Sequence, residues 1–463
     1  MCSLQYLRWS ERFCQRKAPQ GCRCSGSPRV TVNQPSMRRI LLLLTTIVLL
    51  IGPAAGAESS RVPATDPTSI SPADWPWWRG PTRNGIAPGN QRPPVTWSGT
   101  RNVVWKFAVP GRGHGSPTIV GTRVFLATAE RTTQTQSLLC LDRTTGRQLW
   151  RTIVHQGNLE TRGNRKSTQA SCTPACDGAR VYVNFLNDGS VYTTALDLQG
   201  QQVWQTWITK YRTHQGFSSS PAIYDNLVLV SADTRAGGAV AALDRRTGKV
   251  VWKHSRPKKA NYTSPIVLKA AGRDQAVMVG TNLVTSFNPQ SGRKIWEIDG
   301  ATTECVTSVV TDGKRVFTSG GYPRNHVSAI KADGSGIVVW ANTQPVYVPS
   351  MLVHAGTLYA VLDAGVATAW DSATGKTLWK KRLGGTFSSS LVLANGNIYA
   401  SAEDGRTHVF KADPKSFQPV AVNKLGDEVL ASLAICRSQA FQRVAVHSGE
   451  QRQEWLYCLG RKD

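Results

Sequence analysis

The stretch ALDRRTGKVVW, residues 242–252, decides the fold because near-copies of it occur elsewhere in the chain. CLDRTTGRQLW covers residues 140–150, and AWDSATGKTLW covers residues 369–379. In each copy an apolar segment leads into Asp-x-x-Thr-Gly, and a segment that ends in Trp follows. This pattern predicts two antiparallel strands joined by a tight turn, in which glycine supplies a positive φ.

Two residue columns run through the whole chain and indicate a repeat protein. The Trp that ends the phrase occurs at Trp150, Trp204, Trp252, Trp296, Trp340 and Trp379, always four residues after a Gly. A second column holds one small hydroxyl residue per unit: Ser116, Thr173, Ser220, Ser264, Ser308, Ser350, Ser390 and Ser432. The hydroxyl column defines eight units. The seventh unit is degenerate and has Val420 near the Trp position.

Each unit divides into four short apolar strands separated by turns with Gly, Asp or Asn. A single sheet of this kind is apolar on both faces, and a ring of such sheets buries both. We therefore predict an all-β, eight-bladed β-propeller with four-stranded antiparallel blades, in which the Trp side chains pack between blades. The C-terminal EWLYCLGRKD lacks a Trp strand, and the segment at 102–107, with Trp105, can supply it. The N- and C-terminal strands are thus expected to close the last blade.

The N-terminal region has the features of an export signal. Residues 37–57, MRRILLLLTTIVLLIGPAAGA, combine two Arg, an apolar run and small residues before a cleavage site predicted after Ala57. The apolar run is too short for a normal transmembrane span. Residues 1–36 fit no targeting pattern, so Met37 is taken as the start; residues 58–101 form a leader that packs on the propeller at 102–463. We expect an exported, soluble protein of the periplasm or cell envelope.

Charge and cysteine content give weaker indications. The formal net charge is +26, from 55 basic and 29 acidic residues, which suits an anionic polymer or simply a basic solvated surface. No cluster of basic residues alternates with aromatics as in a nucleic-acid-binding module. Cys172 and Cys176 fall on one predicted strand, too far apart for a disulfide. The six cysteines after residue 57 are therefore predicted to be buried free thiols.

The combination of Asp-x-x-Thr-Gly-x-x-x-Trp with eight units resembles the pyrroloquinoline-quinone-type (PQQ-like) β-propeller repeat, from Trp75 to Leu459. That superfamily includes quinoprotein alcohol dehydrogenases and BamB-type outer-membrane assembly propellers. The segment DWPWWRGPTRNGIAP at 74–88 looks like the leader of a group of exported bacterial propellers. The dehydrogenases use adjacent cysteines against the quinone and a calcium held by Glu, Asn and Asp beside a catalytic Asp. No two cysteines are adjacent here and no such cluster is recognisable, so no cofactor or metal site is predicted. The lipid-acceptor cysteine usual in the BamB type is missing after the apolar run.

Candidate binding residues occur in two groups. Those just before the hydroxyl column, near a central funnel, are His114, Phe217, Tyr262, Glu304, Tyr347 and Phe387. Those on the loops at 156–169 and 210–216 are Arg162, Arg165, Lys166, Lys210, Arg212 and His214. The alternatives are chance variation around a solvent-filled channel and ordinary loop solubility. Trp75, Trp77 and Trp78 could form a carbohydrate-stacking platform or pin the leader to the propeller.

Two functions remain open from these residues. The first is a non-enzymatic binding or scaffold module of the cell envelope, which engages a protein partner or an anionic polymer through its basic rim. A partner strand added to a blade edge is one available mode. The alternative is a PQQ-dependent dehydrogenase with a diverged site. No catalytic residue is predicted, because no Ser-His-Asp arrangement, phosphate loop or metal-ligand spacing has a supporting context.

Overall fold

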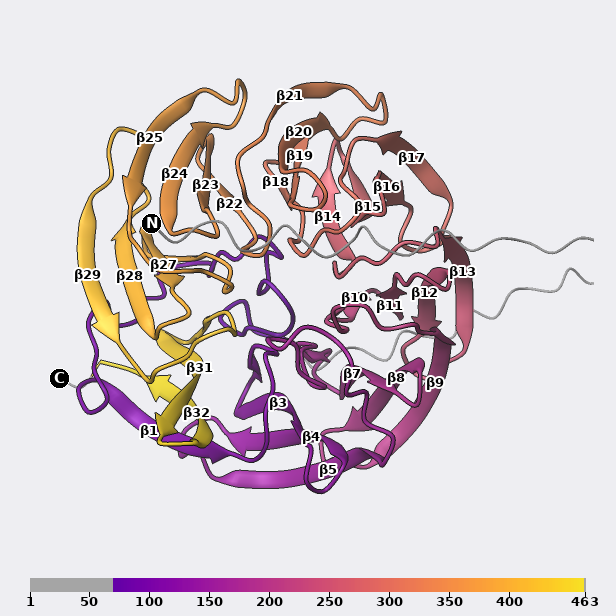
Figure 1. Ribbon diagram of the computed structural model, residues 1–463, viewed down its shortest axis with the longest axis vertical. Coiled ribbons are helices and arrows are strands. Elements are labelled where there is room, and N and C mark those ends of the chain that lie inside the picture. The colour runs from indigo at the N-terminus through magenta and orange to yellow at the C-terminus, as the bar shows by residue number, and fades with distance from the viewer. Residues whose placement is uncertain (1–69, 462–463) are drawn as a thin grey trace, which may run out of the picture. The chain divides into compact units, whose positions relative to one another are not determined.

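The computed structural model describes residues 70–461, so the predicted signal peptide at 37–57 lies outside the described residues. Its 32 strands form eight four-stranded antiparallel sheets, and residues 70–461 contain no helix. Nothing in that range could therefore cross a membrane as a helix. Figure 1 shows the sheets arranged as blades around a central axis. The predicted eight-bladed propeller is confirmed.

The four strands of a blade run from the channel outward. The innermost strands are β2 (Thr118–Val120), β6 (Ala175–Cys176), β10 (Ala222–Tyr224), β14 (Ile266–Ala270), β18 (Val310–Thr311), β22 (Leu352–His354), β26 (Val392–Ala394) and β30 (Ala434–Cys436). The second strands are β3 (Arg123–Glu130), β7 (Arg180–Asn187), β11 (Leu227–Ala232), β15 (Arg273–Gly280), β19 (Arg315–Gly320), β23 (Thr357–Val361), β27 (Asn397–Ser401) and β31 (Gln439–Ser448). The third are β4 (Thr135–Asp142), β8 (Ser190–Asp197), β12 (Gly238–Asp244), β16 (Leu283–Phe287), β20 (His326–Lys331), β24 (Val366–Asp371), β28 (Arg406–Lys411) and β32 (Gln451–Leu459). The outer strands are β5 (Gln148–Gln156), β9 (Gln202–Lys210), β13 (Val250–Arg256), β17 (Lys294–Asp299), β21 (Val338–Asn342), β25 (Thr377–Arg382), β29 (Pro419–Lys424) and β1 (Val103–Val109).

The ring closes by pairing the first strand with the last. Strand β1 is hydrogen-bonded to β32, with Val103 opposite Leu459 and Phe107 opposite Leu456. Blade eight therefore has the order β1-β32-β31-β30, with its outer strand taken from the N-terminal side of the chain. This pairing confirms the predicted closure, which leaves no unpaired strand at the seam of the ring.

The repeated Trp and Gly form one contact between neighbouring blades. Gly248 has φ 74°, and a Cβ atom there would lie 2.6 Å from the Trp204 ring of the preceding blade. The Trp204 indole also donates a hydrogen bond of 3.0 Å to the carbonyl of Arg245 in the same turn. Indole bonds to the next blade recur at Trp105, Trp150, Trp204, Trp252, Trp340 and Trp379. Glycine is thus required because the Trp ring occupies the space of a side chain.

Two blades depart from this contact. Trp296 donates to the side-chain oxygen of Gln275 in its own blade, and the Gln275 amide donates to Ala332 of the next blade at 2.8 Å. In blade seven the Trp position is held by Ala421, opposite Val409 and next to the Val420 that was predicted near it. The hairpin is two residues longer here, because Lys411, the equivalent of Asp371, is ten residues before Ala421, whereas Asp371 is eight before Trp379.

The six cysteines in the described chain are free and buried, as predicted. The geometric argument for Cys172 and Cys176 was wrong in detail. Strand β6 contains only Ala175 and Cys176, so Cys172 lies in the loop before the strand. Burial raises the pKa of both thiols, which keeps them protonated and unreactive.

The leader crosses one end of the channel, where Figure 1 shows it in indigo at the centre of the ring. The backbone of Trp75 pairs with Ile119 of blade one, and Gly85 accepts a bond of 2.8 Å from Leu393 of blade seven. The buried Arg79 guanidinium donates to the carbonyls of Met351 and Leu391, at 2.6 and 2.8 Å. In blades one, six and seven these contacts lie just after the residue of the hydroxyl column. The leader therefore covers the end of the channel toward which the innermost strands run.

Candidate functional site

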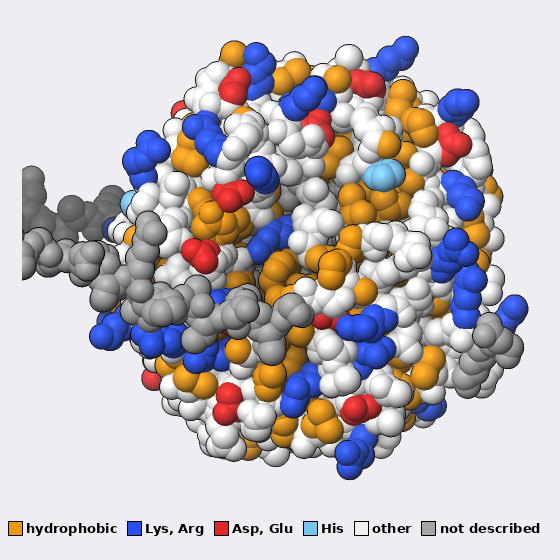
Figure 2. Space-filling model, turned by 180° about the vertical axis from the view of Figure 1, so that it is seen from behind, with side chains coloured by type: hydrophobic (Ala, Val, Ile, Leu, Met, Phe, Trp, Pro, Cys, Tyr) orange, Lys and Arg blue, Asp and Glu red, His pale blue; other side chains and the backbone are white. Residues whose placement is uncertain are grey.

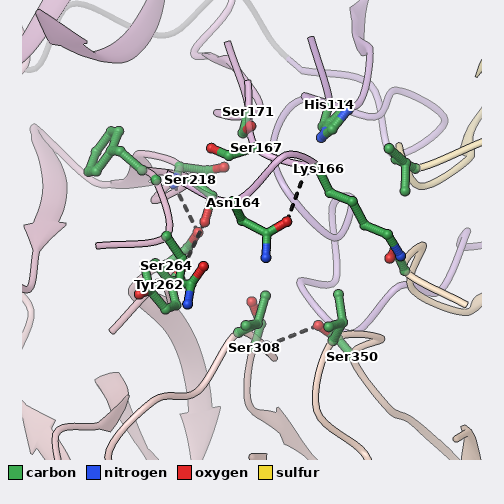
Figure 3. Close-up of a pocket in the computed structure, with 18 of the residues that line it drawn as sticks. His114, Asn164, Lys166, Ser167, Ser171, Ser218, Tyr262, Ser264, Ser308 and Ser350 are labelled. Atoms are coloured by element: carbon green, nitrogen blue, oxygen red, sulfur yellow. Dashed lines mark hydrogen bonds between the residues drawn. The ribbon is translucent and has the colours of Figure 1, made fainter. Parts of the chain in front are cut away.

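A chamber of about 600 Å³ occupies the channel above the leader. All eight residues of the hydroxyl column line it, together with Trp78 from the leader. Figure 3 shows Ser264, Ser308 and Ser350 along one side of this space, with His114 and Lys166 across from them. A chamber of this size is within the ~300–1,000 Å³ range of small-molecule sites.

The column hydroxyls link neighbouring blades. Six of the eight accept a hydrogen bond from the backbone N–H of the column residue in the preceding blade, with N···O distances of 2.8–3.0 Å. The bonds form two half-rings, from Ser116 through Thr173 and Ser220 to Ser264 and from Ser308 through Ser350 and Ser390 to Ser432. Because the hydroxyl group is both donor and acceptor, a hydroxyl that accepts such a bond still has its own proton to donate.

A buried carboxylate lies at the mouth of the chamber. The Glu304 side chain is 5% exposed, and one of its oxygens is 3.2 Å from His214 Nδ1. The Tyr262 hydroxyl donates to the other oxygen at 3.4 Å, and Arg235 lies 3.9 Å from Glu304. Burial and the charge of Glu304 raise the pKa of Tyr262, so its hydroxyl remains a neutral donor. Glu304 is therefore held by contacts with His214 and Tyr262 and lies near the positive charge of Arg235.

The loop at 156–169, here called the strap, reaches over the mouth from blade one to blade seven. Its base is fixed by a bond of 2.9 Å from the Asn164 backbone to the carbonyl of Gln215. Its Lys166 ammonium donates to both oxygens of Glu403, at 2.9 and 2.7 Å. Glu403 also accepts a bond from the Ser388 hydroxyl. The second carboxylate near the mouth is thus paired with Lys166.

Two polar side chains beside the seam of the ring have buried atoms without a partner among residues 70–461. Ser116 is 2% exposed, and its hydroxyl oxygen has no hydrogen-bond partner. Nε2 of His114 is likewise buried and unpaired, and both residues line the chamber. Burial, with the charges of Arg112 and Arg443 adding to it, holds the pKa of His114 well below its usual value. His114 is therefore a neutral imidazole.

The structure brings most of the sequence candidates to one place. His114, Lys166, His214, Phe217, Tyr262, Glu304 and Tyr347 line the chamber. Phe387 does not, because it packs in the core with Leu391 and Phe410. Arg162 and Arg165 are exposed on the strap, and Lys210 and Arg212 are exposed beside it.

Sequence reasoning missed several residues of the site. Arg235 and Glu403 lie between the second and third strands of their blades, in turns that reach the same mouth as the loops before the hydroxyl column. The turn between the second and third strands of each repeat is therefore the sequence feature that could have identified both residues. The hydroxyl column was recognised only as a marker of the repeat, and the structure shows it as the chamber wall.

A family model described as "Outer membrane protein assembly factor BamB" matches residues 95–215, 135–367 and 323–416. These matches overlap and cover more than half of the chain. The chain belongs to the BamB family. A membership of this kind fixes the repeat architecture and leaves the activity to the residues of the site.

The relatives of this BamB-family chain include both assembly factors and dehydrogenases. The outer membrane protein assembly factor BamB of Yersinia pestis is 26% identical over 333 residues, which cover 68% of this chain and 79% of that protein. The polyvinylalcohol dehydrogenase of a Pseudomonas species is 28% identical over 207 residues, or 41% of this chain. That match spans only 30% of the dehydrogenase.

Solved structures show the same fold at low identity. A europium-containing methanol dehydrogenase superposes with a TM-score of 0.62 at 12% identity, covering 84% of this chain and 98% of that one. BamB from Moraxella catarrhalis superposes with a TM-score of 0.54 at 12% identity, covering 76% and 96%. At such identities the likeness concerns the propeller alone.

The resemblance to quinoproteins allows a test of whether this chamber fits a calcium-bound quinone. Such a centre needs uncompensated carboxylates, whereas Glu304 and Glu403 are both engaged by basic side chains. Residues 70–461 contain no group of three His, Cys, Asp or Glu that could hold a metal. The chamber lining of the described chain includes no cysteine. The donor set does not fit that arrangement.

Proposed function

We propose that this protein is a non-enzymatic binding propeller of the cell envelope, which engages its partner at the mouth of the channel. The observation that carries the proposal is the asymmetry of the channel. One end is covered by the leader, through Trp75, Arg79 and Gly85, while the other opens beneath the strap. Loops on a rigid scaffold are the usual place for recognition, and the strap presents Arg162 and Arg165 to solvent there.

Two further observations support a binding role. The chain belongs to the family of the outer membrane protein assembly factor BamB, a name that refers to assembly of outer membrane proteins. The carboxylates of the chamber are also in contact with His214, Arg235 and Lys166 and do not form the set that a calcium-bound quinone needs. On the face in Figure 2, Lys and Arg side chains are spread around the surface with Asp and Glu between them. This distribution favours a protein partner over a uniformly anionic polymer.

The binding role is tested by affinity capture. The exported protein, immobilised, is incubated with envelope extract beside a strap variant, Arg162→Gln with Arg165→Gln. A variant with the same change in charge, Lys376→Gln with Lys381→Gln, is the control, because both lysines are exposed on the outer hairpin of blade six. We expect one reproducible partner that the control retains and the strap variant loses. Recovery of no reproducible partner, even at low salt, overturns the proposal.

The second candidate is a quinone-dependent dehydrogenase with a diverged site. It is supported by the similarity to a polyvinylalcohol dehydrogenase and by the methanol dehydrogenase fold. The test is to add PQQ and calcium to the purified protein and measure dye-linked oxidation of alcohols and sugars. Turnover that depends on added PQQ would replace the binding role with this activity.

A further inference from the structure

The two half-rings of column hydroxyls leave two gaps on opposite sides of the chamber. In blade five, Ser308 accepts no bond from the preceding column residue. Its hydroxyl oxygen instead accepts a hydrogen bond of 2.7 Å from the Trp78 indole N–H. In blade one, Ser116 is in the equivalent position, and its oxygen has no partner among residues 70–461. The leader therefore completes one gap in the ring and leaves the other open.

At the open gap, an unpaired hydroxyl group lies buried in the wall of the chamber. Ser116 is 2% exposed, and a hydroxyl buried without a partner costs about 1–3 kcal/mol. His114, two residues earlier, adds a second unpaired buried atom, Nε2. Both residues line the chamber, so polar groups of a ligand at this part of the wall can pair with them.

The charged side chains of the chamber contact one another, so they do not favour a charged ligand. Glu304 contacts His214 and lies 3.9 Å from the Arg235 guanidinium, and Lys166 is paired with Glu403. His114 is a neutral imidazole that donates at one nitrogen and accepts at the other. What the walls leave available is a set of hydroxyl groups, a neutral imidazole and the Asn164 amide.

The floor adds a flat apolar surface. Trp78 is partly exposed, lines the chamber, and is fixed by its bond to Ser308. Of the three tryptophans in the leader motif, Trp75 is buried in the core and Trp77 lies under the Arg83 guanidinium, 4.3 Å from its ring centroid. Trp78 is therefore the one whose ring a chamber ligand can contact.

We propose that the chamber binds a neutral polyhydroxylated ligand of the sugar class, with an apolar face on Trp78 and its hydroxyl groups paired with Ser116 and His114. A sugar hydroxyl both donates and accepts, which matches the unpaired pair and the column hydroxyls. The C–H face of the ring matches the indole, since aromatic side chains offer apolar contact area. This inference rests on the proposed binding function and names a ligand for the chamber beneath the strap.

The test is titration calorimetry of the exported protein with a panel of neutral mono- and disaccharides in gluco, galacto and manno configurations, including N-acetyl forms. Inorganic phosphate and galacturonate form the anionic arm. We expect saturable binding of at least one neutral sugar and none of phosphate. Binding of the anions alone, or of no compound in the panel, overturns the inference.

Variants locate the binding site. Ser116→Ala removes no hydrogen bond within the described protein and removes an unpaired buried hydroxyl, so we expect a thermal unfolding temperature that is not lowered and a Kd weakened about tenfold, which corresponds to about 1.4 kcal/mol. Trp78→Ala should weaken binding by at least as much, while Trp78→Phe retains the aromatic face and should bind more tightly than Trp78→Ala. Trp455→Phe is the control, because that ring packs under Lys106 on the outer part of blade eight. Equal sugar affinity in all four variants also overturns the inference.

The two proposals fail separately. Partner capture that depends on the strap, without sugar binding, removes only the sugar ligand. PQQ-dependent turnover removes the binding role itself, whatever the sugar titrations give.

Discussion

At the scale of single residues, two partly buried histidines, His155 and His326, make the stability of this protein sensitive to acid. His155 lies between Phe185 and Tyr192, with ring centroids 6.0 and 5.3 Å away, and its Nε2 is buried without a partner in the described chain. Burial lowers the pKa of His155 to about 4, and burial lowers the pKa of His326 to about 4 as well. Both imidazoles are neutral in the folded protein at neutral pH.

We predict that the free energy of unfolding falls as the pH is lowered from about 6.5, the ordinary pKa of histidine, to about 4. In this window the unfolded chain takes up protons that the folded chain does not, so acid favours unfolding; below it both states are protonated and this contribution levels off. Each histidine contributes at most about 1.4 kcal/mol per pH unit. Denaturant unfolding at a series of pH values measures the slope. His155→Phe should flatten the profile, and the exposed His354→Ala should leave it unchanged; a wild-type slope in His155→Phe contradicts the prediction.

At the scale of the strand and turn, the Trp–Gly contact joins one blade to the next. The glycine of the turn meets two demands, a left-handed backbone and space for the neighbouring indole. At Gly248 both apply, because φ is 74° and Trp204 fills the side-chain position. Gly272, with the same φ of 74°, has no atom within 4 Å of a Cβ position.

Substitutions at Gly248 and Gly272 separate the cost of the left-handed backbone from the cost of crowding the Trp204 ring. Gly272→Ala should cost only the left-handed conformation, about 1–2 kcal/mol. Gly248→Ala should cost more, by about 1 kcal/mol or above, because overpacking is added to the backbone term. Urea unfolding of the two variants measures the difference. Equal destabilisation would mean that the Trp204 ring moves aside without loss.

At the scale of the whole molecule, the leader acts as a brace across the ring. Arg79 is 2% exposed and donates hydrogen bonds to carbonyls of Asn84, Met351 and Leu391, which belong to the leader and to blades six and seven. Burial lowers the pKa of the Arg79 guanidinium to about 9, so it stays charged at neutral pH. A single side chain thus joins the leader to two blades.

Arg79→Ala should release the leader without dismantling the blades. We expect a loss of roughly 2–4 kcal/mol, because the carbonyls that it satisfied become unpaired buried acceptors. Limited proteolysis should then cut within residues 70–101, while the fragment from β1 onward resists. Arg92→Ala, at an exposed position of the same leader, should show neither effect. A protease pattern identical to that of the unchanged protein would contradict the bracing role.

The strands, the blade count and the closure of the ring could be predicted from the sequence, because each depends on local patterns that recur: alternating apolar residues, Asp-x-x-Thr-Gly turns and a Trp in seven of the eight blades. The candidate site could be predicted only in part. The position before the hydroxyl column pointed to His114, Tyr262 and Glu304, since a repeat places equivalent positions at equivalent heights in the channel. It failed for Phe387, whose side chain turns into the core.

Only the tertiary structure decided which of these side chains meet. Lys166 and Glu403 are 237 residues apart in the chain and are joined because the ring brings the strap of blade one to blade seven. The unpaired Ser116 and the filled Ser308 are indistinguishable in sequence, both being members of one column. Their difference depends on where the leader places Trp78, a contact between segments that no local pattern relates. Periodicity therefore determined the scaffold, and closure of the ring determined the site.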